Sequence, residues 1–500
     1  MTPETLAALK QGGLVLTVNR RLARHIQQQF GEAQLAEGHG VWPTPKVAAW
    51  EDWLDALWQR IEHEPSLTLL QSHQLSALWE DVVKRSTSAG QLLNPANTAA
   101  MAIKAYNLLK QWNLGLDAVS DSDHPDVQAF AQWMRDYQQR CQQQGWLDGH
   151  ARLALLVDAI EGGDLPLPEQ IVWVGFDSLT PQQRRVMAAL HQAGCRVSEE
   201  SHVSPQGQAS CRPCSDAMGE LESAAAWALQ LQKQNSNHRI AIVVPDLAGG
   251  RSDVMRIFDE ALCPDTVLKL TDEFTRPYNL SCGMPLAESP PIAVALALLS
   301  LANAPLELAA LGRLIQSPYL AGGESELGAR ALLDRHLREL GDARYSLANM
   351  ARLAAAERLS CPQLAASFKA MVETKATLPR RQCPSAWVAS LRALLKAGGW
   401  PGERPLSSAE YQAVEVWQGL LGKFSSLDIV VGEVGFSDAV SHLKQMAADH
   451  PFQLKTPEAQ VQILGMLEAA GLDFDYLWIT GLHDGVWPPA PRPNPFLPMS

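Results

Sequence analysis

Basic side chains gather at one turn near the start of the chain. Arg20, Arg21, Arg24 and His25 follow Asn19 directly and form the densest basic group in the sequence. Guanidinium groups placed at such a turn can hold one or two phosphates of a nucleic-acid backbone. The same pattern is typical of a solvated helix start, so both interpretations stay open at this point.

A second candidate site is a short acidic loop near the other end of the chain. Residues 468–475, EAAGLDFD, separate the apolar runs Val461–Leu464 and Tyr476–Thr480. Such runs of large apolar residues favour parallel strands that are buried on both faces. The loop therefore places Gly471 and Asp473 where one buried strand passes to the next. An ordinary buried corner between strands, with an Asp-rich loop, explains the same pattern.

The residues needed for nucleotide hydrolysis do not occur in the sequence. A phosphate-binding loop has the pattern GxxxxGK[ST], in which backbone amides hold the phosphates, the Lys neutralises them and the hydroxyl holds magnesium. This pattern is found nowhere in the 500 residues. Cys211 and Cys214 form a CxxC pair, but no second pair or His partner stands at metal-binding spacing. We therefore expect no catalytic residue, no metal site and no cofactor.

The composition indicates a chain of several domains. Its 500 residues exceed one ordinary domain and suggest about two to four, and 46% hydrophobic residues provide ample core. A formal charge of -13 argues against a broadly basic surface but leaves room for a local basic track. No stretch approaches the ~20 apolar residues of a membrane span, and the first residues lack the pattern of a signal peptide. With eight cysteines in no disulfide-like framework, these features predict a cytoplasmic protein.

Apolar runs predict the strands of a parallel α/β protein. The first strand is expected at Leu14–Val18, followed by a turn and by a helix at Arg21–Phe30 with its apolar residues on one side. A second strand is expected at Ile171–Val174. A helix at Asp216–Lys233 and a strand at Arg239–Pro245 begin the second half of the chain.

Two long regions have helical periodicity. Within residues 50–160 and again within 305–453, apolar residues recur at intervals of three and four. Several Trp residues follow this spacing and could be imagined as stacking platforms for bases. Each belongs to an apolar stripe, so core packing is the better interpretation. A polar, turn-rich segment at Ser198–Pro213 marks the boundary between the two halves.

Several segments together resemble superfamily-one helicases. Leu14–Phe30 is similar to the helicase segment whose Thr-Asn-x-x-Ala-type turn touches single-stranded DNA. Val461–Pro488 looks like the segment that links nucleotide state to the DNA track. The residues that match this second pattern are Ala469, Gly471, Leu472, Asp473, Phe474, Ile479, Gly481, Gly485 and Pro488.

Two further segments resemble a narrower group. Asn279–Leu286, NLSCGMPL, is similar to the signature F-N-h-S-x-G-x-P-L, in which h is apolar, and Leu314–Leu320, LIQSPYL, looks like L-h-x-S-P-h-h. Both signatures are characteristic of AddB-type subunits of bacterial helicase-nuclease complexes and of related probable DNA repair proteins. Such proteins usually continue into a PD-(D/E)XK nuclease domain. Nothing like one is found here, so we expect residues 488–500 to be a Pro-rich connector to a missing C-terminal part.

The sequence departs from the helicase pattern at residues that helicases use for ATP hydrolysis and for contacts with nucleotide or DNA. Gly175 and Phe176 stand where helicases carry the acidic pair that binds magnesium. Leu467 stands where a His is usual, and Ala470 where a Lys is usual. The segment Thr180–Gln183 still looks like the T-P-L-Q that opens the next helix, so the resemblance implies a scaffold that persists without its catalytic residues.

The resemblance implies an α/β fold with two RecA-like, P-loop NTPase-like domains, each built on a parallel sheet and carrying a large helical insertion. The first domain is expected at 1–200, with its insertion at about 50–165. A linker at 201–215 leads to a second domain at 216–487, with its insertion at about 287–455.

The resemblance also implies a role in DNA repair or recombination. We expect residues 1–500 to be a non-catalytic, helicase-like part that binds or guides DNA for a nuclease domain or a partner motor. The expected DNA-binding residues are Asn19, Arg20, Arg21, Arg24, Gly471 and Asp473. Two alternatives stay open: an ATP-dependent DNA helicase subunit with a degenerate site, and a protein-protein scaffold without DNA contact, which the acidic charge mildly favours.

Overall fold

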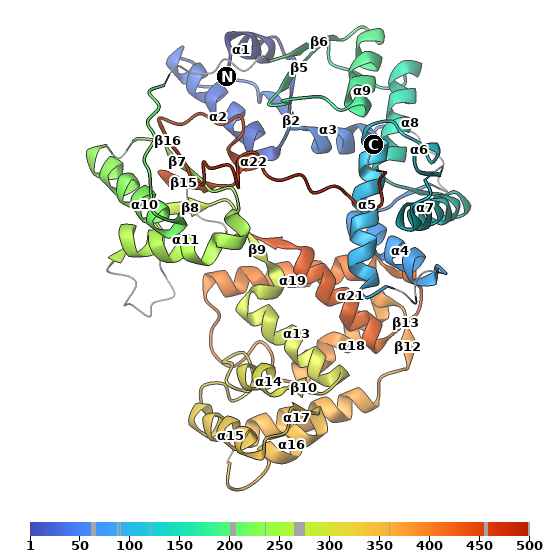
Figure 1. The fold of residues 1–500 in the computed structure, drawn as a ribbon, viewed down its shortest axis with the longest axis vertical. Helices are drawn as coiled ribbons and strands as arrows, with labels where there is room; N and C mark the ends of the chain where they lie inside the picture. The colour runs from blue at the N-terminus through green and yellow to red at the C-terminus, as the bar shows by residue number, and fades with distance from the viewer. Residues whose placement is uncertain are drawn as a thin grey trace. The chain divides into compact units, whose positions relative to one another are not determined.

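The structure, a computed structural model, forms two compact units. The first unit combines Met1–Leu247 with Gln460–Ser500, and the second is Ala248–Ala459. Both are drawn as ribbons in Figure 1. The described residues are 1–61, 67–87, 90, 92–120, 122–200, 207–235, 237–264, 276–359, 361–454 and 459–498.

The first unit begins with a parallel sheet of four strands. Its strands are β1 (Leu14–Thr17), β2 (Lys46–Ala49), β5 (Gln170–Val174) and β6 (Arg196–Glu199). They lie in the order β2-β1-β5-β6, and every neighbouring pair is parallel. The chain moves from β1 outward to β2 and then returns to β5 on the other side of β1. The order of strands thus reverses between β1 and β5, which is where open α/β sheets bind ligands.

Helices and two short strands make up the rest of the first 200 residues. The helices are α1 (Pro3–Lys10), α2 (Arg20–Ala36), α3 (Trp50–Trp58), α4 (Ser72–Arg85), α5 (Pro95–Gln111), α6 (Asp117–Ser120), α7 (Pro125–Gln144), α8 (Gly149–Gly162) and α9 (Pro181–Gln192), and the short strands are β3 (Thr68–Leu69) and β4 (Trp146–Leu147). The predicted strand-turn-helix at the start of the chain and the strand near 171 are confirmed.

Both faces of this sheet are buried, as the apolar runs predict. On one face, Leu16, Ile171 and Trp173 pack in a core with residues of α3, α8 and α9. The alternate residues Val15 and Val172 pack on the opposite face with residues of α1 and α2. Because successive side chains of a strand point to opposite faces, an uninterrupted apolar run produces this two-sided burial.

The Trp residues of the helical region lie mainly in the core. Trp53, Trp79 and Trp133 are 6%, 1% and 1% exposed, which confirms core packing for them. Trp79 stacks against Tyr137 with ring centroids 4.6 Å apart. Trp112 at the end of α5 differs, because 59% of it is exposed.

A second parallel sheet in the first unit is built from distant parts of the chain. Its central strand β7 (Ile240–Val243) pairs in parallel with β15 (Val461–Leu464) on one side and β16 (Tyr476–Ile479) on the other. The helix α10 (Ala217–Gln234) precedes β7, and α22 (Met466–Ala469) follows β15. The predicted strands and the helix before β7 are confirmed.

Two details of this second sheet differ from the sequence prediction. β16 is the edge strand of its sheet, so Leu477 is 51% exposed and the strand is not buried on both faces. The expected loop at 468–475 begins inside α22, since Glu468 and Ala469 form the end of this short helix. Only the remaining residues form an irregular loop.

The Pro-rich segment at the C-terminal end of the described chain packs against helices of the first unit. Phe496 is 7% exposed, and its ring centroid lies 5.8 Å from that of Phe130 and 5.4 Å from that of Trp133, both on α7. The Asn494 side-chain amide donates a hydrogen bond of 2.9 Å to the carbonyl of Met101 on α5. The segment is extended, as its proline content predicts, but it is anchored at its aromatic residue. The expectation that it connects to a further part stays a prediction.

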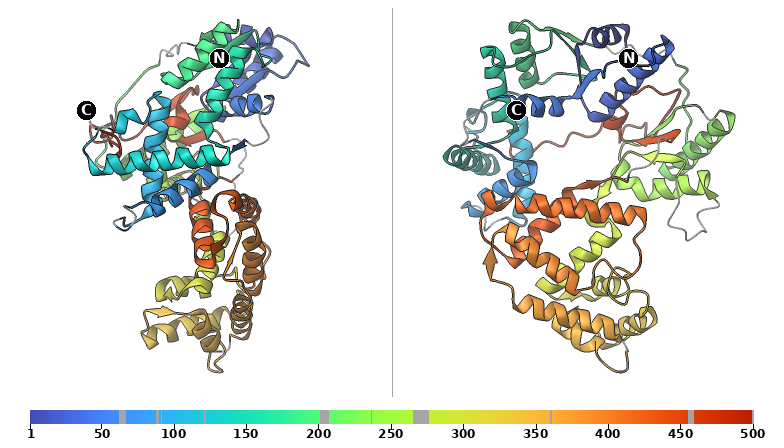
Figure 2. Two further views of the ribbon diagram at one scale, coloured as in Figure 1. Left: turned by 90° about the vertical axis from the view of Figure 1, so that its right-hand side faces the viewer. Right: turned by 180° about the vertical axis from the view of Figure 1, so that it is seen from behind.

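The second unit is mainly helical, and its helices are coloured from green through yellow to orange in Figure 2. Its longer helices are α11 (Leu247–Leu262), α13 (Pro290–Asn303), α14 (Leu308–Ile315), α15 (Leu327–Leu340), α16 (Leu347–Ala354), α17 (Pro362–Ala376), α18 (Pro384–Ala397), α19 (Ser408–Ser425) and α21 (Phe436–Asp449). The short elements are β8 (Tyr278–Leu280), β9 (Met284–Pro285), η2 (Leu286–Glu288), β10 (Leu306–Glu307), β11 (Arg344–Tyr345), β12 (Arg381–Gln382), α20 (Asp428–Val431), β13 (Val434–Gly435) and β14 (Pro451–Phe452). Trp387, Trp417 and Phe368 are fully buried in its core.

These observations establish an α/β protein with parallel sheets. The helical insertion expected at about 287–455 lies entirely inside the second unit. The division between the units falls at 247/248 and 459/460, whereas the boundary expected from the sequence lies at 201–215, of which residues 201–206 are outside the described residues. No helix among the described residues is long and apolar enough to cross a membrane.

Candidate nucleic-acid interface

Asn19 begins α2 by capping it. Its side-chain Oδ1 accepts a hydrogen bond of 2.8 Å from the backbone N–H of Leu22, which satisfies one of the free donors of the first helical turn. The Thr17 hydroxyl donates to the Asn19 carbonyl at 2.8 Å. The turn that carries the basic residues is therefore held from both sides, and the Asn19 oxygen is committed to the helix.

Arg20 is paired with Asp52. The Arg20 Nε lies 2.9 Å from Asp52 Oδ2, and the Arg20 Nη2 lies 2.5 Å from Asp52 Oδ1. The two side chains thus form a bidentate ion pair. The hydrogen bond from Arg20 lowers the pKa of the Asp52 carboxyl. A phosphate that binds Arg20 has to compete with this carboxylate, so Arg20 offers less to DNA than the sequence suggests.

Arg21 lies beside Arg20 on the first turn of α2, and Arg24 follows one turn later. Arg21 is half-buried, and its burial lowers the pKa of its guanidinium while nearby Glu468 acts in the opposite direction. Arg24 is exposed. Within the part of the chain that the structure describes, neither side chain forms an ion pair. A phosphate can therefore bind Arg21 or Arg24 without first breaking an ion pair.

Leu22 joins this turn to the loop after β15. A β-carbon added to Gly471 would lie 3.1 Å from Leu22 Cδ2, and one added to Gly175 at the end of β5 would lie 2.5 Å from the same atom. Both glycines have left-handed backbone conformations, with φ of +77° and +81°. Leu472 packs against the same apolar group, which includes Ile26. The loop is thus docked on α2 through close backbone contacts that only glycine permits.

Asp473 faces α2 from the same loop. Its Oδ2 accepts a hydrogen bond of 3.2 Å from Gln29 Nε2 and lies 3.8 Å from His25 Nε2. Burial lowers the pKa of His25, although Asp473 opposes this effect, and the buried Nε2 has no hydrogen-bond partner among the described residues. Asp473 therefore connects the loop to α2, and its carboxylate would repel a phosphate.

The predicted residues are thus brought together, along with others that the motif comparison did not include. Arg21, His25 and Gln29 are four residues apart, and Leu22 and Ile26 repeat beside them. Residues four apart lie on one face of a helix. This spacing is the sequence signal that could have identified His25 and Gln29 as neighbours of the loop. No comparable signal indicated the approach of Leu22 to Gly175.

The end of β5 carries apolar groups where the helicase pattern has carboxylates. The Phe176 ring lies 5.0 Å from that of Trp173 and packs against the core. Asp177 is exposed. Thr180 and Gln183 form a reciprocal capping box at the start of α9. Where the strand order reverses, Leu22 therefore packs against Gly175, and Phe176 faces the core.

The second sheet ends in a turn that is held by α10. Glu220 on α10 accepts a hydrogen bond of 3.0 Å from the backbone N–H of Gly481, just after β16. Trp227, about two turns further along the same face of α10, packs against Trp478 with ring centroids 5.4 Å apart. Leu467, which replaces the usual His, is 83% exposed on α22. The segment Val461–Pro488 is therefore anchored at both of its strands and exposes an apolar side chain between them.

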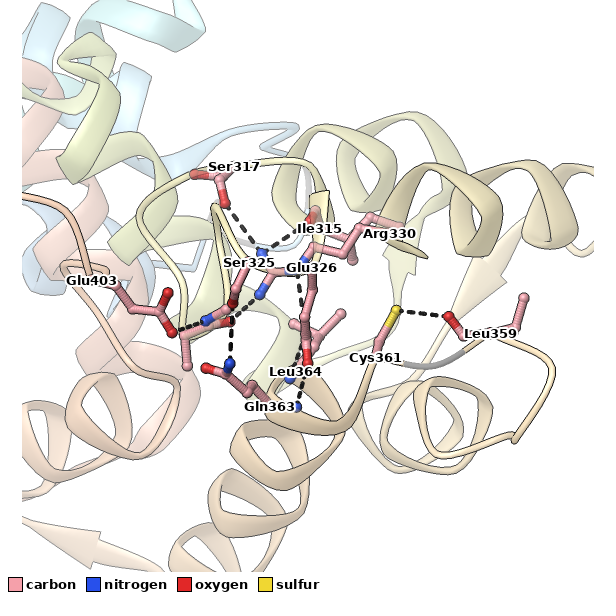
Figure 3. Close-up of polar contacts among 12 residues, drawn as sticks. Ile315, Ser317, Ser325, Glu326, Arg330, Leu359, Cys361, Gln363, Leu364 and Glu403 are labelled. Atoms are coloured by element: carbon pink, nitrogen blue, oxygen red, sulfur yellow. Dashed lines mark hydrogen bonds and ion pairs between the residues drawn. The ribbon is translucent and has the colours of Figure 1, made fainter. Parts of the chain in front are cut away.

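The LIQSPYL segment of the second unit surrounds a buried arginine (Figure 3). Arg330 on α15 is fully buried and donates to the carbonyls of Ile315 and Ser317 at 3.3 Å and to that of Ala321. Glu326 lies 3.7 Å from Arg330 and accepts hydrogen bonds from two backbone amides at the start of α17. Nearly every polar group of this cluster is used internally, so its role is to hold the segment in place.

Comparison with known proteins assigns no family to the chain. No protein-family model matches the sequence, and no curated protein matches it. Among the described residues, no three His, Cys, Asp or Glu side chains form a group that could hold a metal ion. Cys211 and Cys214 are free thiols. The class that the coordinates define is an α/β protein with two parallel sheets in one unit and a helical second unit.

Proposed function

We propose that this chain is a non-catalytic, helicase-like module of DNA repair or recombination that binds single-stranded DNA at the start of α2. In this proposal it guides the strand for a nuclease domain or a partner motor. The observation that carries the proposal is the docking of the 471–473 loop on α2, beside the turn with Arg21 and Arg24. Gln29 and Asp473, which make this contact, are 444 residues apart in sequence. One belongs to the segment that resembles a helicase segment touching single-stranded DNA, and the other to the segment that resembles the link between nucleotide state and the DNA track.

The two parallel sheets support the assignment of two RecA-like cores. Each has a central strand, β1 or β7, with parallel neighbours on both sides. In the proposal, β1 and β5 correspond to the first helicase core, and β7, β15 and β16 to the second. The helical second unit then corresponds to the insertion of the second core.

Arg21 and Arg24 supply the phosphate contacts in this proposal. Arg20 contributes only after its pair with Asp52 opens, and Asp473 positions the loop without touching the strand. Three carboxylates, those of Asp52, Glu468 and Asp473, lie near the same turn. Their repulsion weakens phosphate binding, so we expect affinity that is measurable mainly at low salt.

The proposed non-catalytic character rests on the residues found at the ends of β1 and β5. Phosphate sites in such folds need backbone amides and a cation at the end of the first strand. Here the Leu22 side chain packs against Gly175 after β5, and Phe176 packs against the core. This arrangement favours a guiding module over a motor subunit.

Fluorescence anisotropy of a labelled single-stranded oligonucleotide tests the proposal. The protein is titrated into the oligonucleotide at several salt concentrations, because phosphate contacts impose a linear dependence of log K on log salt. We expect saturable binding that weakens steeply as salt rises. Absence of binding even at low salt would favour the alternative, a protein-protein scaffold without DNA contact.

A further inference from the structure

A cavity of about 570 Å³ lies among α3, α4, α5, α8 and the start of α9. This volume is within the range of about 300–1,000 Å³ that is common for small-molecule sites. Its walls include the aromatic rings of Trp50, Trp79 and Tyr106. Ser72 and Gly149 line it and are exposed, so the cavity opens to solvent. It belongs to the first unit and is separate from the α2 turn.

Amide groups in the cavity are positioned by a histidine. His150 Nε2 lies 3.1 Å from Asn107 Oδ1, and His150 Nδ1 lies 3.1 Å from Gln182 Oε1. Both contacts join a ring nitrogen to an amide oxygen, so the imidazole positions the two amides through their oxygens. Both amides line the cavity. Each amide keeps its NH2 group, a hydrogen-bond donor, for a ligand.

The charged groups of the cavity disfavour an anion. Asp148 is buried and accepts hydrogen bonds from the Tyr106 hydroxyl at 2.7 Å and the Tyr137 hydroxyl at 2.9 Å. Arg152, the cation of the lining, is neutralised by Asp55 and by Glu51 at 3.1 Å. Carboxylates thus outnumber guanidinium groups, and a phosphate would be repelled.

Arg152 also indicates a missing acceptor. It is 6% exposed, and its Nε has no hydrogen-bond partner in the described chain. A buried donor without an acceptor is unfavourable, so it favours a ligand that supplies a carbonyl oxygen or a ring nitrogen. The ligand is therefore neutral and carries hydrogen-bond acceptors, and aromatic walls suit a planar ring.

We propose that this cavity binds an uncharged nucleobase. Side-chain amides complement the donor and acceptor edges of bases, and an extruded base is read by such groups together with stacking. The base can come from a free nucleoside or from an unpaired nucleotide of a DNA strand. The second source rests on the proposed DNA-binding function, whereas the first does not.

Equilibrium binding of the four common nucleosides tests this assignment. Isothermal calorimetry of the full chain should detect saturable binding of at least one nucleoside, with stoichiometry near one. Asn107→Leu and Gln182→Met remove the amides with little change of volume, and each should weaken binding by about tenfold, as expected for a lost hydrogen bond in a buried site. Ile103→Trp fills the cavity and should abolish binding.

The control substitutions lie on the same helices as the test substitutions but outside the cavity. Asn97→Leu changes an exposed Asn on α5, and Gln192→Met changes an exposed Gln on α9. Both should bind nucleosides like the original protein. If no nucleoside binds at millimolar concentration, or if the controls weaken binding as much as the cavity variants, the assignment is wrong.

Experiments with oligonucleotides distinguish a free nucleoside from a base of a DNA strand as the ligand. They also test the cavity independently of the proposed function. An abasic site in the oligonucleotide should weaken strand binding if a strand base enters the cavity, and a free nucleoside should then compete. Nucleoside binding without any oligonucleotide binding would support the cavity and contradict the proposed function. Oligonucleotide binding that depends on Arg21 and Arg24, with no nucleoside binding and no effect of the cavity variants, would contradict the cavity alone.

Discussion

The Leu22 side chain occupies the space that a β-carbon at Gly175 would need, with Cδ2 only 2.5 Å from that position. Leu22 is on the first turn of α2, and Gly175 follows β5, so the contact lies where the strand order reverses. The same methyl group limits Gly471 on the loop after β15. One side chain thus contacts both the end of β5 in the first sheet and the loop that follows β15 in the second.

Gly175→Ala should destabilise the protein by two effects. The left-handed backbone costs an alanine about 1–2 kcal/mol, and the clash with Leu22 adds about 1–3 kcal/mol of overpacking. Urea unfolding followed by circular dichroism measures the sum. Gly194→Ala is the control, because Gly194 has φ of +88° but open space around it, so only the backbone cost applies. Equal losses in the two variants would show that the Leu22 contact carries no energy.

ATP should not bind at micromolar concentration. The sequence has no phosphate-binding loop motif, and β5 is followed by Gly175 and Phe176 instead of carboxylates. Calorimetric titration with ATP and magnesium should give only the heat of dilution. DNA-stimulated ATP hydrolysis that co-purifies with the protein and persists in a homogeneous sample would contradict this prediction.

The sequence was sufficient to predict the elements that depend on local pattern. The apolar run Val461–Leu464 coincides with β15, and Asn19 marks the start of α2 because its side chain caps the helix. The two-sided burial of β1 also follows from its run of apolar residues. Each of these features depends on residues that are neighbours in the chain.

The remaining features depend on contacts between distant residues. The exposure of Leu477 results from the edge position of β16, which an apolar run cannot reveal. The pairing of Arg20 with Asp52 depends on where α3 lies, so the basic turn is less free than its composition suggests. The anchoring of Phe496 on α7 likewise needed the structure, since a proline-rich segment indicates extension but not its contacts.

Acid should destabilise the α2 interface through His25. Burial lowers the folded-state pKa of His25, so the unfolded chain binds this proton more readily than the folded one. The stabilising contribution is complete above the ordinary pKa near 6.5 and is lost as pH falls below it, by at most about 1.4 kcal/mol per pH unit. Urea unfolding at pH 7.5 and at pH 5.5 should therefore show a smaller acid loss in His25→Gln than in the original protein.

His124→Gln is the control for this experiment, because His124 is 63% exposed at its side chain. It should retain the full acid loss. If His25→Gln behaves like His124→Gln, the burial of His25 against the loop is not what makes the interface sensitive to acid.

Arg330→Met should unfold the second unit more easily. Removing the guanidinium leaves Glu326 buried without its cation and leaves three carbonyls without a donor. Breaking a buried pair in this way typically costs about 3–5 kcal/mol. Differential scanning calorimetry measures the change, and Arg335→Met on the same helix, where the side chain is 75% exposed, should change stability by less than about 0.5 kcal/mol. Similar effects of the two substitutions would contradict a structural role for Arg330.

The most direct test of the proposed function is the salt dependence of single-strand binding in Arg21→Gln/Arg24→Gln. Each lost phosphate contact should flatten the slope of log K against log salt by about 0.7 units for a single strand, so the double variant should lose about 1.4 units. Arg335→Gln/Arg338→Gln is the control, because it removes two exposed arginines with the same spacing from α15. We expect a flattened slope and weaker binding in the first variant and an unchanged slope in the second. Equal slopes in all three proteins would contradict DNA binding at the start of α2.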